Sequence, residues 1–476
     1  MNFPAPMPRR PGTAAAGLRF SMVSALIAIG FTVLLTAPSL IAFGLPTYAV
    51  LPVMAIVPIA ATGYMFTNAI TRGAFRFNFN LLLLLLLVLN LAIFASGFMF
   101  SLRNGVPIAH DQLVNTAAYV FIASVSALLF CTLVSNSRYP ATSIMSALFI
   151  ASLLICVINM MLIAGGLENP ASIGQPQTQS PGMFSKALGL GINRIMMPLS
   201  SGFQNGAVVP TTLCVLSAGF SGRYKALRLF AFVLGALLLL LLDTRMFMVA
   251  IGMAFAVRFA RSAIAIAAAA IAFPWLEVVF VNFSQNFPTL AALATGRVDK
   301  YGLFSGREFV WNCFWDYFAK ARSSQVFFGN GLFGQANTGV SKNYAEVFHS
   351  WSGEMRATIS LHNAFLQMIM DTGILGLVAF CVLLFAVVRR AEVLATIDVL
   401  DGSGWRVLSL LLLTFASIAG TEMVIGWYMK ESVSITASLF FILAFFGGRR
   451  TDGNPTRSAN PTGEGPGPGP VIPVGG

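Results

Sequence analysis

The pair His362-Asn363 contains the side chain type that most readily exchanges a proton at neutral pH. The chain has only three histidines, and His362 lies between the longest polar stretch and an apolar run of membrane-spanning length. A proton-exchanging side chain where lipid meets water favours acid–base chemistry on a lipid-borne substrate. The alternative is an interfacial histidine beside an asparagine that caps the helix. His349 and His110 have no comparable motif around them.

Arg245 is the first of three arginines that could bind an anion. It follows Asp243-Thr244, between two apolar runs. A helix from Arg228 to Asp243 rises roughly 22 Å, whereas the hydrocarbon core is roughly 30 Å thick. We therefore expect Arg245 below the outer surface, at the floor of a polar cavity, where an ionised side chain is costly and indicates function. The alternative is a hairpin cap in which Asp243 and Arg245 satisfy each other.

Arg307 is the second candidate, and Arg194 is the third. Arg307 stands at the start of a predicted amphipathic helix whose aromatic side chains would pack at the membrane surface. A surface salt bridge from Arg307 to Glu308 or Asp316 is the alternative. The aromatic residues of this helix are Phe309, Trp311, Phe314, Trp315 and Phe318.

The glycine-rich stretch 328–334 follows this helix and predicts a turn. Glycines of this kind are weak evidence for phosphate binding, because no strand-then-helix context surrounds them.

Composition makes the chain a membrane protein. It has 476 residues, of which 57% are hydrophobic and only 10% are charged, and this excludes an ordinary soluble domain. Backbone N–H and C=O groups inside a bilayer must be hydrogen-bonded within the protein, and a helix does this within one segment. We therefore expect an all-α polytopic fold. Hydropathy predicts about twelve transmembrane helices, at residues 20–43, 46–65, 78–100, 112–134, 141–164, 206–220, 226–242, 245–260, 263–281, 363–388, 406–425 and 432–447.

Loop charge orients these helices. Short basic connections alternate along the chain and place both termini in the cytoplasm, so the net charge of +12 does not indicate nucleic-acid binding. Two long connections, 165–205 and 282–361, then lie on the opposite face. We divide the chain into a cytoplasmic segment 1–19, a transmembrane domain 20–447 that includes the large external loop 282–361, and a disordered Pro/Gly-rich tail 448–476. The five scattered cysteines imply neither a disulfide framework nor a metal cluster.

Three motifs in order, Thr244-Arg245, Gly306-Arg307 and His362-Asn363, resemble the O-antigen ligase and polymerase superfamily, which includes Wzy-type exopolysaccharide polymerases. The resemblance covers roughly residues 190–390 and is strongest from Ser305 to Leu377. Met246 departs from the family pattern, which has a small residue after the arginine. Asn193-Arg194 with Gln204-Asn205-Gly206 is a further match.

The resemblance implies a GT-C-type inverting glycosyltransferase with a large external loop. It would move a glycan from an undecaprenyl-pyrophosphate donor to an acceptor hydroxyl, with His362 as general base and Arg245, Arg307 and Arg194 holding the pyrophosphate. We expect neither a metal nor a cofactor, because the external loops contain no Asp-x-Asp motif and arginines can replace the charge of a metal.

The implied partners are a lipid-linked oligosaccharide donor and acceptor, membrane lipids, a chain-length regulator and a flippase, but no nucleic acid. The implied location is the bacterial inner membrane, with the site facing the periplasm. Polymerisation of exopolysaccharide or O-antigen repeat units is the preferred activity. Two alternatives stay open: a ligase that transfers O-antigen to lipid A core, and a flippase for the same lipid-linked glycan.

Overall fold

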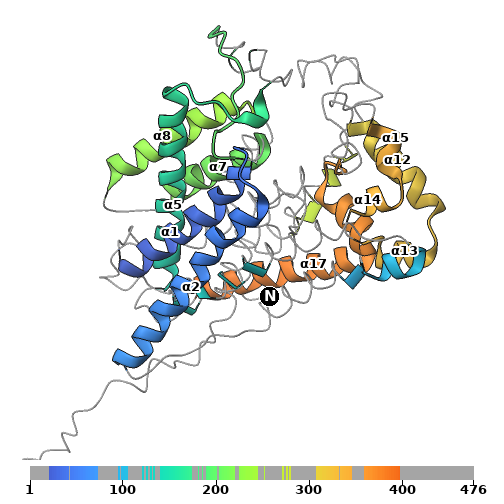
Figure 1. Ribbon diagram of the computed structural model, residues 1–476, viewed down its shortest axis with the longest axis horizontal. Helices are drawn as coiled ribbons and strands as arrows, with labels where there is room; N and C mark the ends of the chain where they lie inside the picture. The colour runs from blue at the N-terminus through green and yellow to red at the C-terminus, as the bar shows by residue number, and fades with distance from the viewer. Residues whose placement is uncertain are drawn as a thin grey trace, which may run out of the picture.

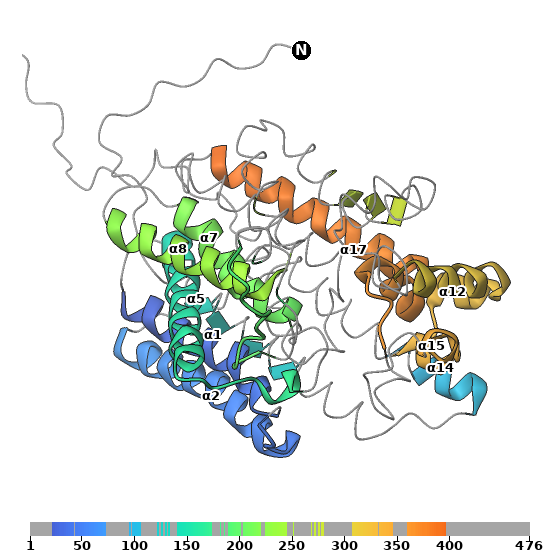
Figure 2. The same cartoon turned by 90° about the horizontal axis from the view of Figure 1, so that it is seen from above.

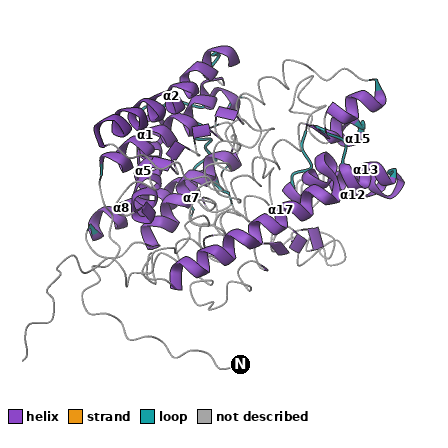
Figure 3. Cartoon of the chain, turned by 90° about the horizontal axis from the view of Figure 1, so that it is seen from below, coloured by secondary structure: helices purple, strands orange, loops and turns teal. Residues whose placement is uncertain are grey.

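The computed structural model describes residues 21–72, 95–105, 140–173, 189–200, 203–219, 224–244, 307–345 and 359–396 with short gaps, and isolated positions within 121–133, 181–185 and 251–279. The described part is helical, and the one strand-like feature in it is an isolated bridge between Pro181 and Asn193 (Figure 3). The chain is therefore an all-α protein over these residues.

The helices gather in two groups that α17 connects (Figures 1 and 2). The first group is α1 (Met22–Thr36), η1 (Ala37–Ile41), α2 (Thr47–Arg72), α5 (Pro140–Ala164), η2 (Pro170–Ser172), α7 (Phe203–Gly219) and α8 (Lys225–Leu242). The second group is α12 (Arg307–Lys320), α13 (Ser323–Phe328), α14 (Gly334–Asn337) and α15 (Val340–Tyr344), which pack at the N-terminal end of α17 (Ala364–Thr396).

Within the described residues, five helices are long and apolar enough to cross a membrane: Met22–Ile41, Tyr48–Thr71, Met145–Ala164, Lys225–Leu242 and Phe365–Val382. A shorter apolar helix covers Gly206–Ala218. The chain is thus an all-α membrane protein, and six predicted spans are confirmed as helices. The other six spans, the segment 1–19 and the tail 448–476 lie wholly or largely outside the described residues, so the total of twelve stays a prediction.

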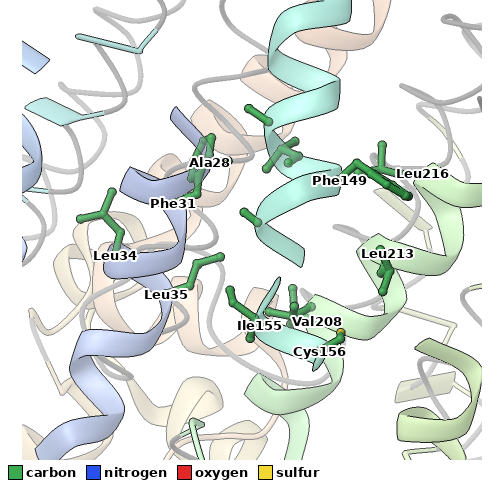
Figure 4. Packing of buried hydrophobic residues seen from close by; sticks show 14 of the residues in the cluster. Ala28, Phe31, Leu34, Leu35, Phe149, Ile155, Cys156, Val208, Leu213 and Leu216 are labelled. Atoms are coloured by element: carbon green, nitrogen blue, oxygen red, sulfur yellow. The ribbon is translucent and has the colours of Figure 1, made fainter. Parts of the chain in front are cut away.

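The core of the first group lies between α1, α5, α7 and α8. Large apolar side chains such as Phe31 of α1 and Phe149 of α5 are almost fully buried there, and Figure 4 shows them with residues of α7. Water does not drive helices together inside a lipid bilayer, so close van der Waals packing of this kind is the main source of association. The C-terminal part of α8 therefore packs against the other helices of this group.

The structure breaks α17 at Gly373, where the backbone has φ 72° and ψ −175°. Hydropathy predicts one span at 363–388, and a straight helix from His362 to Arg389 would rise about 40 Å. The break makes that length an upper limit. The loop 329–331 packs against the break and donates hydrogen bonds to the helix carbonyls there. Asn330 N donates to Met370 O, and Gly331 N donates to Asp371 O, both at 2.9 Å.

A second buried cluster lies where α12 meets the start of α17. Trp311 and Phe314 of α12 pack there with Tyr344 of α15, with Leu361, and with Met370 of α17. Because α12 begins at Arg307 and α17 begins just after His362, this cluster brings the helix of Arg307 against the segment that leads into His362.

Candidate functional site

His362 lies in a tight turn directly before α17. Its φ of 51° is left-handed, a conformation in which histidine is more common than most residues but which still needs support. Asn363 supplies part of that support, because its Oδ1 accepts hydrogen bonds from Phe365 N (3.0 Å) and Leu366 N (3.1 Å). The predicted asparagine cap is therefore present, and it fixes the direction in which the chain enters the helix.

Arg307 and His362 lie close enough to interact electrostatically, although they are far apart in the sequence. Burial first, and the positive charge of Arg307 second, lower the pKa of the His362 imidazole from 6.5 to about 3. The residue as a whole keeps some exposure, but its ring Nε2 is buried. At neutral pH the imidazole is therefore uncharged, and one of its ring nitrogens carries no proton.

The surface salt bridge considered for Arg307, to Glu308 or Asp316, stays an alternative. The buried Oε2 of Glu308 has no hydrogen-bond partner in the described part of the chain.

Arg194 lies at the C-terminal end of α8. Its Nε donates to Leu242 O at 2.7 Å, and the next residue, Ile195, donates its backbone N–H to Leu241 O at 3.0 Å. The last carbonyls of a helix lack partners within the helix and carry partial negative charge, so a guanidinium is favourable there. Arg194 therefore has a capping role that the sequence did not predict.

Two buried asparagines hold the Arg194 segment in place. Asn159 Oδ1 accepts from Leu199 N at 2.8 Å. Asn169 Nδ2 donates to backbone carbonyls of this segment, the shortest contact being to Ser200 O at 2.6 Å. Buried amides of this kind are costly unless satisfied, so these contacts favour one path for the segment.

The turn after α8 is buried. Asp243 takes a left-handed conformation with φ 48°, and Asp243 and Thr244 are each 5% exposed. Thr244 Oγ1 has no hydrogen-bond partner within the described residues. The depth argued from helix length stays a prediction, because Arg245 itself lies outside the described residues.

The sequence analysis missed a buried polar network behind the His362 turn. Gln367 Nε2 donates to Gln335 Oε1 (2.7 Å) and to Asp371 Oδ1 (2.9 Å), and Asp371 Oδ1 also accepts from Gly334 N (2.9 Å). A signal for it exists: Asn363, Gln367 and Asp371 are spaced four apart in an otherwise apolar segment, and that spacing puts them on one helix face.

The glycine-rich turn is a packing element. Besides the two amides given to α17, Gly329 N donates to Gln325 O at 2.9 Å, so these backbone donors are used within the protein. Gly329 has φ 73°, and a Cβ there would overlap the backbone carbonyl of Asp371. The sequence evidence against a phosphate loop agrees with this arrangement.

This close approach leads to a stability prediction. We expect Gly329→Ala to lower the apparent Tm of the detergent-purified protein, because overpacking costs about 1–3 kcal/mol beyond the left-handed backbone cost. Gly339→Ala is the matched control, since Gly339 has φ 76° but open space around its Cβ position. Equal Tm values for the two variants would contradict the close contact between the turn and α17.

A family model for O-antigen ligase matches residues 230–381. Over this segment the chain is similar to the O-antigen ligase family, which supports the O-antigen ligase and polymerase superfamily. The O-antigen ligase segment contains Asp243-Thr244, Arg307 and His362, whereas Arg194 lies before it. No curated protein matches the chain. The O-antigen ligase family comprises membrane enzymes of the glycosyltransferase type, so the superfamily resemblance drawn from the ordered motifs is confirmed.

Proposed function

We propose that the chain is an inverting glycosyltransferase that polymerises lipid-linked glycan repeat units at the periplasmic face of the bacterial inner membrane. The observation that carries the proposal is the proximity of Arg307 and His362 within an O-antigen ligase domain. The guanidinium of Arg307 is suited to bind a phosphate, and the imidazole of His362 is suited to accept the proton of a hydroxyl group. Glycan transfer from a pyrophosphate needs both.

In this reaction an acceptor hydroxyl gives its proton to the His362 imidazole as its oxygen attacks the anomeric carbon of the donor. The bond from that carbon to the pyrophosphate breaks, and undecaprenyl pyrophosphate leaves with the electron pair. Arg307 compensates the charge that develops on the leaving group, with Arg245 and Arg194 as further candidates. Displacement from the opposite side inverts the anomeric configuration.

The low pKa of His362 is compatible with this role once the donor is bound. Without substrate, Arg307 is one of the two causes that lower it. A bound pyrophosphate would offset the positive charge of Arg307, and a nearby negative charge favours the imidazolium. The donor would therefore increase the basicity of His362 when a proton has to be accepted.

The test is to give the purified protein, in liposomes, lipid-linked repeat units with and without a chelator. We expect products longer than one repeat unit in both conditions, because arginines supply the positive charge. Transfer to lipid A core without elongation would favour the ligase. Translocation without bond formation would favour the flippase, and loss of growth with the chelator would contradict metal independence.

A further inference from the structure

The backbone of Leu361, the residue before His362, is held through both its N–H and its C=O group. Leu361 O accepts a hydrogen bond from Trp311 Nε1 at 2.8 Å, and Leu361 N donates to Gln367 Oε1 at 3.0 Å. Trp311 is 2% exposed and belongs to α12, whereas Gln367 is 2% exposed and belongs to α17. The peptide groups on either side of Leu361 are each bound to a different helix, so the backbone at this buried residue has little freedom to rotate.

Gln367 is itself held in one orientation. Both contacts of its Nε2, to Gln335 Oε1 and Asp371 Oδ1, are to side-chain acceptors. A flipped amide would direct its oxygen at these two acceptors and its nitrogen at the Leu361 N–H, and every contact would be lost. The network behind the turn therefore fixes the acceptor that holds Leu361.

Trp311 follows Arg307 by four residues, which is about one turn of the same helix. Its hydrogen bond thus connects the helix of Arg307 directly to the residue before His362. We propose that Trp311 and Gln367 are positioning residues, which clamp Leu361 and thereby hold His362 at a fixed place beside Arg307. The catalytic consequence rests on the glycosyltransferase function proposed above, whereas the geometric consequence does not.

Trp311→Phe tests the clamp, because it removes the Nε1 donor and keeps an aromatic ring. Trp315→Phe is the matched control: Trp315 lies one turn later on α12 and contacts Phe314 and Phe318 through its ring, with no hydrogen bond to the 359–363 turn. The first readout is substrate-free. Histidine-labelled protein is titrated by NMR, and His110→Asn and His349→Asn variants assign the three imidazole signals.

In Trp311→Phe we expect His362 to titrate at higher pH than in the parent, because a looser turn lets the imidazole move away from Arg307 and toward water. Trp315→Phe should titrate like the parent. Superimposable His362 titrations in the parent and Trp311→Phe would overturn the clamp. Gln367→Met removes the hydrogen bond to Leu361 N and should also raise the pH at which His362 titrates. If one of the two variants fails to fold, the other still decides the question.

The second readout is turnover with lipid-linked repeat units. We expect Trp311→Phe to lower kcat roughly 10- to 100-fold, as misplacement of a catalytic group does, with KM near the parent value. The acid limb of kcat/KM should move to higher pH together with the NMR titration. A shifted titration in a protein that transfers no glycan would support the clamp and contradict the proposed function. An unshifted titration with lowered kcat would overturn the clamp.

Discussion

Replacing His362 with alanine is expected to abolish polymer formation while the protein still accumulates in the membrane. A positioned general base contributes about 10²- to 10⁴-fold to the rate. The turn should survive, because the side chains of Ser360, Asn363 and Gln367 accept backbone hydrogen bonds that hold it. The measurement is polymer length in cells that carry the variant as their only copy.

The left-handed backbone at His362 requires a second variant. Alanine is disfavoured at a φ of 51°, whereas asparagine tolerates it. His362→Asn should therefore lose polymer as His362→Ala does, and its Tm should stay closer to that of the parent. His349→Ala is the control and should make polymer of normal length. Full-length polymer from the two His362 variants at normal protein levels would contradict the role of His362 as general base.

Arg307→Ala is expected to lower turnover on the order of a hundredfold, since loss of one donor aimed at developing charge typically costs that much. Arg307→Lys should recover only part of it, because an ammonium keeps the charge but lacks the bidentate fork. Lys320→Ala removes one exposed positive charge at the other end of α12 and should be nearly neutral. Transfer rates with purified lipid-linked repeat units provide the comparison.

Arg307→Ala also has an expected effect that needs no substrate. Because the charge of Arg307 lowers the pKa of His362, its removal should raise that pKa, although burial should keep it below the ordinary value. The acid limb of kcat/KM should then move to higher pH. An unchanged pKa of His362 in this variant would contradict the proximity of the two residues.

The helical elements were largely predictable, because hydropathy records what a bilayer requires of a spanning segment. The ends of α5 and α8 fall within one residue of the predicted spans at 141–164 and 226–242. The break in α17 was not predictable in this way. Glycine is frequent in membrane helices, and what distinguishes Gly373 is that a Cβ there would overlap the backbone of Phe327, a residue distant in sequence.

In the candidate site, too, local contacts were predictable from the sequence and contacts between distant segments were not. The asparagine cap at Asn363 was predictable, because capping is a local contact between a side chain and the next backbone amides. The contacts of Arg194 with Leu242 and of Trp311 with Leu361 were not, because they join segments far apart in the chain. Composition showed which residues could bind phosphate or accept a proton, but only the packing of α12 on the start of α17 placed two of them together.

The most direct test of the central claim, that Arg307 and His362 act on one substrate in one step, is a double-mutant cycle. The rates kcat/KM of Arg307→Ala, His362→Asn and the double variant are compared with the parent in the same liposome assay. Residues that act as a unit are strongly non-additive. We therefore predict that the double variant is no slower than the slower single variant. Losses that multiply in the double variant would show that the two residues act independently, and would contradict a shared site.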